Sequence, residues 1–238
     1  MLNAIKAEFT KILTLRATYI VSAVLVGLAA IVGFATAAVS ASENPGILNT
    51  AVQTTFSLTI AIFAIVASLI ILNEYRHSTI AYTITASRSR YTVFISKVIA
   101  ALGYGMSVSL VVSIIAVLAG VIGLAVSGNS ITDQEFDIGG LLLHEGLHVF
   151  AYILIGLFLG FILRNIIILI VIIFVVPVVE TASILVLKDG IQYLPFTSIG
   201  MLSRTGEYAA DPANVIVAFL YLIGLAALAL FLFIRRDA

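Results

Sequence analysis

The sequence predicts an all-α polytopic membrane protein with six transmembrane helices, an N-terminal interfacial amphipathic helix and both termini in the cytoplasm. Of its 238 residues, 62% are hydrophobic and only 10% are charged, and the mean hydropathy is +1.21. Soluble domains use about half apolar and a quarter charged residues, so a chain this apolar needs the bilayer as its solvent. The absence of cysteine excludes disulfides, thiolate metal sites and cysteine nucleophiles.

Six stretches are long and apolar enough to cross a bilayer, whose hydrocarbon core needs about 20 residues per helix. They cover residues 18–41, 54–72, 98–126, 147–163, 166–187 and 213–234. The third is long enough to tilt or to project from the membrane. Only Arg164 and Asn165 separate the fourth from the fifth, which predicts a tight turn between antiparallel helices. Residues 1–238 are therefore expected to form a single transmembrane domain.

The basic residues give the expected orientation. Three precede the first span, four lie between the second and third, one lies between the fourth and fifth, and two follow the sixth. That places ten of the 12 Lys and Arg residues on one side, with only Lys188 and Arg204 on the other. Because Lys and Arg concentrate in cytoplasmic loops, both termini are predicted to be cytoplasmic.

The first 16 residues precede the first span and read as a short amphipathic helix. In 2–16, "LNAIKAEFTKILTLR", the apolar side chains fall near one helical face and the charged ones mostly elsewhere. This pattern favours a helix lying in the cytoplasmic interface over a frayed basic extension. A cleaved signal peptide is disfavoured, because the apolar stretch that follows is too long for one.

The segment 73–97, "NEYRHSTIAYTITASRSRYTVFISK", is predicted to be the longest cytoplasmic loop. It is charged at both ends, but its middle contains Ile80, Tyr82 and Ile84. An exposed loop should not keep such residues unless a partner or the membrane surface covers them. On the other side, 188–212 is too apolar for a free loop and too short to span twice. We therefore expect it to dip into the outer interface as one or two short helices, broken at Pro195 and Gly200.

One short stretch fits a zinc-protease motif. His144-Glu145-Gly146-Leu147-His148 matches H-E-x-x-H, in which two histidines on one helical face bind Zn²⁺ and the glutamate acts as general base. A third ligand is missing, because the only other histidine, His77, is predicted on the opposite side of the membrane. The favoured interpretation is that His144, Glu145 and His148 cap or line the outer end of the fourth span. An intramembrane zinc metalloprotease remains the alternative.

Glu180 is the one acidic residue placed well inside the fifth span. Carboxylates within a membrane are costly, and they usually face a bundle interior or a wet cavity. Two interpretations stay open: Glu180 lines the outer part of a pathway, or it has a structural role, in which it reaches the outer interface or pairs with Arg204 or Lys188.

Three stretches together resemble the permease subunits of ABC-2 type transporters, particularly the small six-span bacterial group that includes bacteriocin-immunity and drug exporters. "IKAEFTKILTLRATY" (5–19) is similar to the family's entry helix. Segment 73–97 resembles its E-x-x-x-x-T element, with Glu74 and Thr79 in register. "YLPFTSIGML" (193–202) resembles its external re-entrant element.

The resemblance implies a permease that forms the substrate pathway of an ATP-driven exporter as a dimer, with a second copy or a related chain, in a prokaryotic cytoplasmic membrane. A separate cytoplasmic ABC ATPase would bind the ATP, and the chain itself contains no G-x-x-x-x-G-K-[ST] phosphate loop. No enzyme activity, cofactor, metal or nucleic-acid partner is then expected. The implied ATPase-coupling residues are Glu74, Tyr75, Arg76, His77, Thr79, Ile80, Tyr82, Arg88 and Arg90. A membrane scaffold or sensor is a weaker alternative, and the sequence fits peptides, lipids or amphiphilic cations equally well as cargo.

Overall fold

The computed structural model describes residues 1–39, 46–87, 89–128, 138–204 and 211–235, and every regular element in these ranges is a helix. The α-helices are α1 (Leu2–Thr14), α2 (Arg16–Val39), α3 (Ile47–Arg76), α4 (Ile80–Ser87), α5 (Arg90–Val126), α6 (Ile138–Leu163), α7 (Ile166–Ala182), α8 (Ile184–Leu187), α9 (Pro195–Gly200) and α10 (Pro212–Arg235). Two 3₁₀ helices, η1 (Lys188–Tyr193) and η2 (Met201–Ser203), flank α9.

The prediction of six membrane-spanning helices is confirmed within the described residues. The spans are α2, α3, α5, α6, α7 continued by α8, and α10. Three of these helices begin well before the apolar stretch that predicted them: α3 at Ile47, α5 at Arg90 and α6 at Ile138. The added turns contain polar side chains that other helices bury, so hydropathy alone does not mark where these helices begin.

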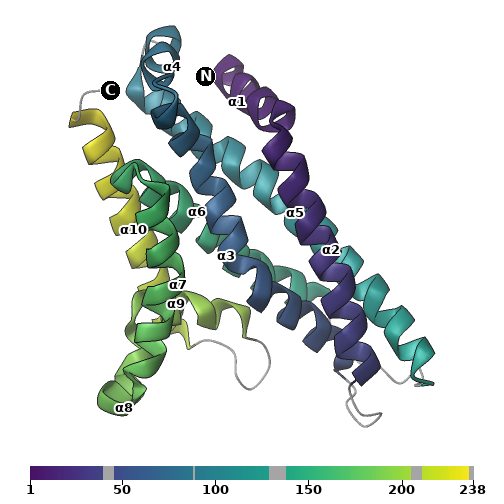
Figure 1. Ribbon diagram of the computed structural model, residues 1–238. Helices are drawn as coiled ribbons and strands as arrows, with labels where there is room; N and C mark the ends of the chain where they lie inside the picture. Colours follow the sequence, from purple (N-terminus) through teal and green to yellow (C-terminus); the bar gives the residue numbers. More distant parts are fainter. Residues whose placement is uncertain (40–45, 88, 129–137, 205–210, 236–238) are drawn as a thin grey trace.

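Helices α3 and α6 form the centre of the bundle, and α2 packs along α5 (Figure 1). Small residues allow the backbones to approach closely at both contacts. A side chain at Gly156 of α6 would collide with the backbone of Ala64 in α3, and one at Gly33 of α2 would collide with Ala116 in α5. Close backbone packing of this kind stabilises helix association in lipid, where the hydrophobic effect does not drive helices together.

An aromatic cluster joins α5, α6 and α10 near one end of the bundle. Phe94 lies 4.9 Å from Phe161 and 6.4 Å from Phe233, measured between ring centroids. Phe161 and Phe233 are also in edge contact, at 5.0 Å. Because aromatic pairs at these distances add to the energy of burial, the cluster fixes the start of α5 against the last turns of α6 and α10.

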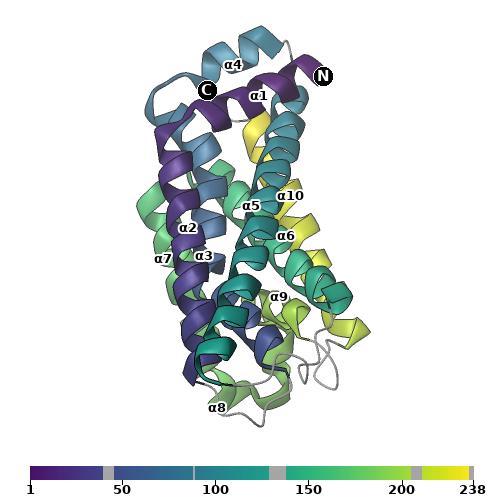
Figure 2. The ribbon, with the colours of Figure 1, turned by 90° about the vertical axis from the view of Figure 1, so that its right-hand side faces the viewer.

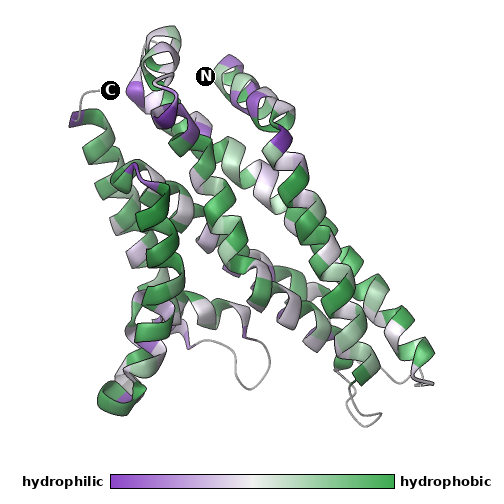
Figure 3. Cartoon of the chain, in the orientation of Figure 1, coloured by the Kyte–Doolittle hydropathy of each residue, from purple (hydrophilic) through white to green (hydrophobic). Residues whose placement is uncertain are grey.

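Both ends of the chain lie at one end of the bundle, which we call the basic end. It holds α1, α4 and the last turn of α10 (Figures 1 and 2). Extended backbone at Leu15 separates α1 from α2, and Figure 2 shows α1 crossing the basic end at a steep angle to α2. Hydrophilic residues gather on α1, on α4 and on the turns beside them, whereas the spans are largely hydrophobic (Figure 3).

The segment between the second and third spans is more helical than expected. Helix α3 continues to Arg76, α4 follows after a short turn, and α5 begins at Arg90. At the opposite end, α9 runs from Pro195 to Gly200, the two residues predicted to break the external segment. Its residues Phe196 and Ile199 are buried in the main hydrophobic core, so this segment packs on the bundle.

Candidate functional site

Helix α4 is a short, partly exposed helix at the basic end, held in place by the turn that precedes it. The amide of Thr79 donates a hydrogen bond of 2.9 Å to the carbonyl oxygen of Glu74, and the Thr79 hydroxyl lies 3.5 Å from the same oxygen. These two contacts close the turn between α3 and α4, which explains the E-x-x-x-x-T spacing in structural terms. Ser78, with φ of 55°, supplies the left-handed residue in that turn.

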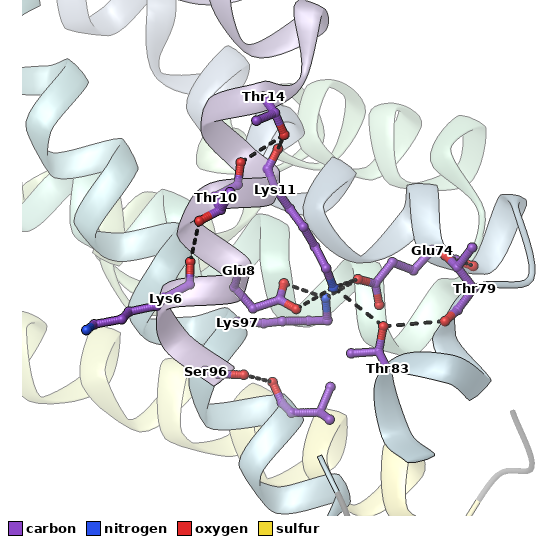
Figure 4. A network of polar contacts seen from close by, with 11 residues as sticks. Lys6, Glu8, Thr10, Lys11, Thr14, Glu74, Thr79, Thr83, Ser96 and Lys97 are labelled. Carbon is purple, nitrogen blue, oxygen red and sulfur yellow. Dashed lines mark hydrogen bonds and ion pairs between the residues drawn. The ribbon is translucent and has the colours of Figure 1, made fainter. Parts of the chain in front are cut away.

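A network of four charged side chains, three of them buried, lies directly under this turn (Figure 4). Lys97 of α5, which is 0% exposed, donates a hydrogen bond of 2.8 Å to Glu8 of α1 and lies 2.8 Å from Glu74 of α3. Lys11 of α1 donates to the same two carboxylates, at 2.7 Å and 2.8 Å. The four residues, Glu8, Lys11, Glu74 and Lys97, are called the inner charge network below.

The inner charge network is balanced, with two ammonium groups facing two carboxylates. Burial alone would lower the pKa of Lys11, but its hydrogen bonds to Glu74 and Glu8 and the attraction of these carboxylates outweigh it, so the pKa is raised from its usual value. Lys11 therefore keeps its charge at neutral pH. Buried ions are tolerated when they are paired in this way, and breaking such a pair costs far more than the pair itself contributes.

The placement of Glu74 and Ile80 corrects one expectation. The sequence suggested that Ile80 and Tyr82 form an apolar patch for a partner, framed by charges that include Glu74. Instead Ile80 is only 3% exposed in the core, and Glu74 is buried in the inner charge network. Tyr82 is 77% exposed. One turn of α4 therefore anchors the helix, and its opposite face presents Tyr82.

The remaining predicted coupling residues divide between anchors and surface. Arg90 donates from Nη1 to the carbonyl oxygens of Phe233 and Ile234, at 3.0 and 2.9 Å, and so caps the end of α10. Tyr75 is partly buried beneath the guanidinium of Arg164, 4.4 Å from the ring centroid. The exposed members of the set are Arg76, His77, Thr79 and Tyr82. Arg88 lies outside the described residues.

A hollow of about 320 Å³ opens at the basic end, next to the last turns of α3. Its lining combines the end of α3 with the turn between α6 and α7, and consists of Leu69, Leu72, Asn73, Tyr75, Arg76, Arg164, Asn165 and Ile166. Two arginines and two asparagine amides give this recess its polar groups. The basic end therefore has a recess that contains two arginines and a protruding tyrosine, Tyr82.

Glu180 lies in the half of α7 that is farther from the basic end, and it holds the start of α9. Its carboxylate accepts hydrogen bonds from the amides of Phe196 and Thr197, at 3.2 and 2.8 Å, and from the Thr197 hydroxyl at 2.9 Å. Neither Lys188 nor Arg204, both described and exposed, forms an ion pair with it. The carboxylate thus replaces water for three donors at a buried helix start.

Substituting Glu180 by glutamine should loosen α9. The substitution removes charge from three hydrogen bonds, and a bond to an ionised group contributes about 1.5–3 kcal/mol. We expect faster modification of a cysteine introduced at Ser203, three residues past α9, in otherwise cysteine-free protein. Thr181→Ala, one residue along α7 and exposed, is the matched control. Equal rates in both variants would show that Glu180 does not hold this segment.

The residues of the zinc-protease motif lie in the half of α6 that is farther from the basic end, and His144 contacts η2. His144 Nδ1 lies 3.1 Å from the carbonyl oxygen of Leu202 in η2. His148 Nδ1 lies 3.7 Å from Oε2 of Glu145, and its ring contacts Tyr152 edge-on. The described residues contain no group of three His, Cys, Asp or Glu side chains arranged to hold a metal ion.

Purified protein without a histidine tag should therefore contain no stoichiometric zinc and cleave no peptide. A zinc protease needs three protein ligands around the metal, whereas the described residues contain no such group and His144 Nδ1 already lies 3.1 Å from the carbonyl oxygen of Leu202. Elemental analysis after dialysis checks this. One tightly bound zinc per chain, lost on His148→Ala, would restore the protease interpretation.

Three members of the inner charge network were not among the predicted site residues. Glu8 and Lys11 lie in the segment predicted to be an interfacial helix, and Lys97 is the last residue of the predicted loop 73–97. The structure buries Glu8 and Lys97 almost completely. The available signals were the i, i+3 spacing of Glu8 and Lys11 and a lysine beside an apolar run, and neither identifies a partner 89 residues away.

Comparison with known proteins agrees with this architecture. The family model described as "ABC-2 family transporter protein" matches residues 4–180, which is more than half of the chain and includes α1, α4 and the inner charge network. A search of curated proteins returned no match. The chain therefore belongs to the ABC-2 family of transporter proteins, as a multi-pass membrane permease of an ABC transporter.

Proposed function

We propose that this permease forms the substrate pathway of an ATP-driven exporter in a prokaryotic cytoplasmic membrane and is driven by a separate ABC ATPase that binds α4. The observation that carries the proposal is the form of α4: an exposed helix whose base is fixed to three other elements. Ile80 enters the core, and the inner charge network ties the preceding turn to α1 and α5. A displacement of α4 by a bound ATPase would therefore also displace the spans.

The exposed face of α4 supports a partner on the cytoplasmic side. Tyr82 is the most exposed large apolar residue on α4, and Arg76 and His77 are exposed on the turn before it. Exposed tyrosine beside positive charge is typical of protein interfaces, where aromatic anchors give affinity and charges give orientation. An ATPase groove with acidic residues at its edge fits this surface.

The pathway is proposed to form between two permease copies. Helices α2, α7 and α10 bury little of their surface within the chain, which leaves room for lipid and for a second copy. The outer half of α3 also has polar positions with partial or full exposure at Gln53, Thr54 and Ser57. Polar groups on a membrane helix normally face a bundle interior or water, so we place the pathway along this part of α3. Glu180 remains a candidate at its outer part, in addition to its contacts with α9.

The orientation follows the positive-inside rule, with the basic end in the cytoplasm. Because the chain lacks cysteine, single cysteines at Ser89 and Ser203 report the two sides. In intact cells an impermeant thiol reagent should label Ser203→Cys and spare Ser89→Cys until the membrane is opened. Labelling of Ser89→Cys alone would reverse the orientation.

The proposal is tested by purifying the chain together with the ABC ATPase of its own cell. In lipid vesicles, ATP hydrolysis by that ATPase should depend on the permease, and export should require both proteins. If the permease forms no complex with any ABC ATPase, or if the purified chain cleaves peptides with bound zinc, the exporter function is wrong.

A further inference from the structure

The buried carboxylate of Glu145 differs from every other buried carboxylate in the described residues. Glu8 and Glu74 face two ammonium groups, and Glu180 accepts three hydrogen bonds. Glu145 is only 3% exposed, and its Oε2 has no hydrogen-bond partner. No described lysine or arginine pairs with it.

Among the ion pairs of the described residues, the one that involves Glu145 is with His148, one turn along α6. Its Nδ1 is 3.7 Å from Glu145 Oε2, is equally buried, and also lacks a hydrogen-bond partner. His148 is 7% exposed. A buried carboxylate oxygen and a buried ring nitrogen, neither with a hydrogen-bond partner, thus face each other at 3.7 Å. A proton bound to either residue offsets the negative charge of the carboxylate.

Charge balance shows why a proton belongs there. With Glu145 ionised and His148 neutral, the pair carries one negative charge in an apolar interior, which is costly without a counter-charge. One bound proton makes the pair neutral overall, whether it resides on the imidazole or on the carboxylate. Histidine takes up protons in the physiological range. We propose that Glu145 and His148 form a proton-binding site whose occupancy controls how firmly the external segment, α9 and η2, packs on α6.

The other titratable groups near the site do not replace this proton. On α6 they are His144 and Tyr152, and on α7 the nearest is Glu180, which already has three donors. Lys188 and Tyr193 lie in η1, Arg204 follows η2, and Tyr221 lies in α10. The outer halves of α3 and α5, which pack on α6, contain no charged residue.

Two routes connect the proton-binding site to the external segment, one through Tyr152 and one through His144. The His148 ring meets Tyr152 at 5.1 Å, and Tyr152 meets Phe196 of α9 at 6.1 Å, between centroids. His144 must donate from Nδ1 to Leu202, because a carbonyl oxygen only accepts. When the proton is absent, the charge on Glu145 attracts water to the contacts that α6 makes with α9 and η2. The external segment should then be looser at high pH and tighter at low pH.

The test uses a nitroxide spin label on a single cysteine at Ser203, with the full chain in lipid nanodiscs. Between about pH 5 and pH 8, where histidine titrates, label mobility should rise with pH along a single transition. Glu145→Gln should abolish the transition, because the buried imidazolium loses its counter-charge. His148→Gln, a near-isosteric change, should displace the midpoint.

Two further variants separate this site from the other histidines. His77→Gln, at the exposed basic end, should leave the profile unchanged. His144→Gln should raise mobility at every pH and keep the midpoint. An absent transition in the unsubstituted background overturns the proposal. So does a transition that survives both Glu145→Gln and His148→Gln unaltered, or one that His144→Gln or His77→Gln alone removes.

Discussion

Substituting Lys97 by methionine should destabilise the protein by about 3–5 kcal/mol, the cost of breaking a buried ion pair. Lys97 is fully buried and lies 2.8 Å from each of two carboxylates on different helices. Methionine fills similar space but leaves Glu8 and Glu74 with Lys11 alone, which is partly exposed. Denaturant titration of the chain in detergent, followed by circular dichroism, measures the loss.

A second substitution separates charge from shape in this experiment. Adding Glu8→Gln to Lys97→Met removes one carboxylate and leaves Glu74 paired with Lys11, so part of the lost stability should return. Lys6→Met, on the exposed side of α1, is the matched control and should change little, because exposed charges contribute less than about 1 kcal/mol. If Lys97→Met and Lys6→Met unfold alike, the inner charge network does not hold α1 to the bundle.

Substituting Tyr82 by alanine should abolish export and weaken ATPase association without unfolding the permease. Tyr82 is 77% exposed, so its removal leaves no cavity in the chain. A large apolar side chain buried in a partner contributes about 1.5–3 kcal/mol, which corresponds to roughly 10- to 100-fold in affinity. Co-purification and ATP-dependent export from vesicles measure the two effects, which should appear together.

The matched control is Tyr193→Ala, at the opposite end of the bundle, where a tyrosine is 45% exposed. It should leave ATPase association unchanged. Glu74→Ala is unsuitable for this purpose, because Glu74 is part of the buried network and its loss would disturb folding. A Tyr82→Ala permease that still binds its ATPase and exports would exclude α4 as the contact.

The six spans were predictable because a helix in lipid satisfies its own backbone hydrogen bonds, so an apolar stretch of sufficient length is a strong signal. The starts of α3, α5 and α6 were not. Their first turns contain Asn49, Lys97 and His144, which look like loop residues until other helices bury or bond them. Hydropathy indicates whether an isolated helix prefers lipid or water, and it contains no information about the helices that pack against it.

The candidate site was predictable in location and less so in the roles of its residues. The apolar character of 80–84 correctly marked a segment that is partly covered, but the cover for Ile80 is the chain's own core. The sequence marked Glu180 as an unusual carboxylate inside a span, and its place in a transport pathway stays a prediction. Its bonding partners, the amides of Phe196 and Thr197, depend on how the segment after α7 folds back. Pairings across 16 or 89 residues are tertiary facts, and a single sequence does not contain them in readable form.

Cross-linking from Tyr82 shows directly whether α4 binds an ABC ATPase, as we propose. Since the chain has no cysteine of its own, Tyr82→Cys can carry a short photoactivatable cross-linker as the single reactive site, with Tyr193→Cys as its counterpart at the other end. The account predicts that Tyr82→Cys cross-links to the ATPase, that nucleotide changes the yield, and that Tyr193→Cys gives no such product. An ATPase that co-purifies but cross-links equally from both positions, or from neither, would contradict it.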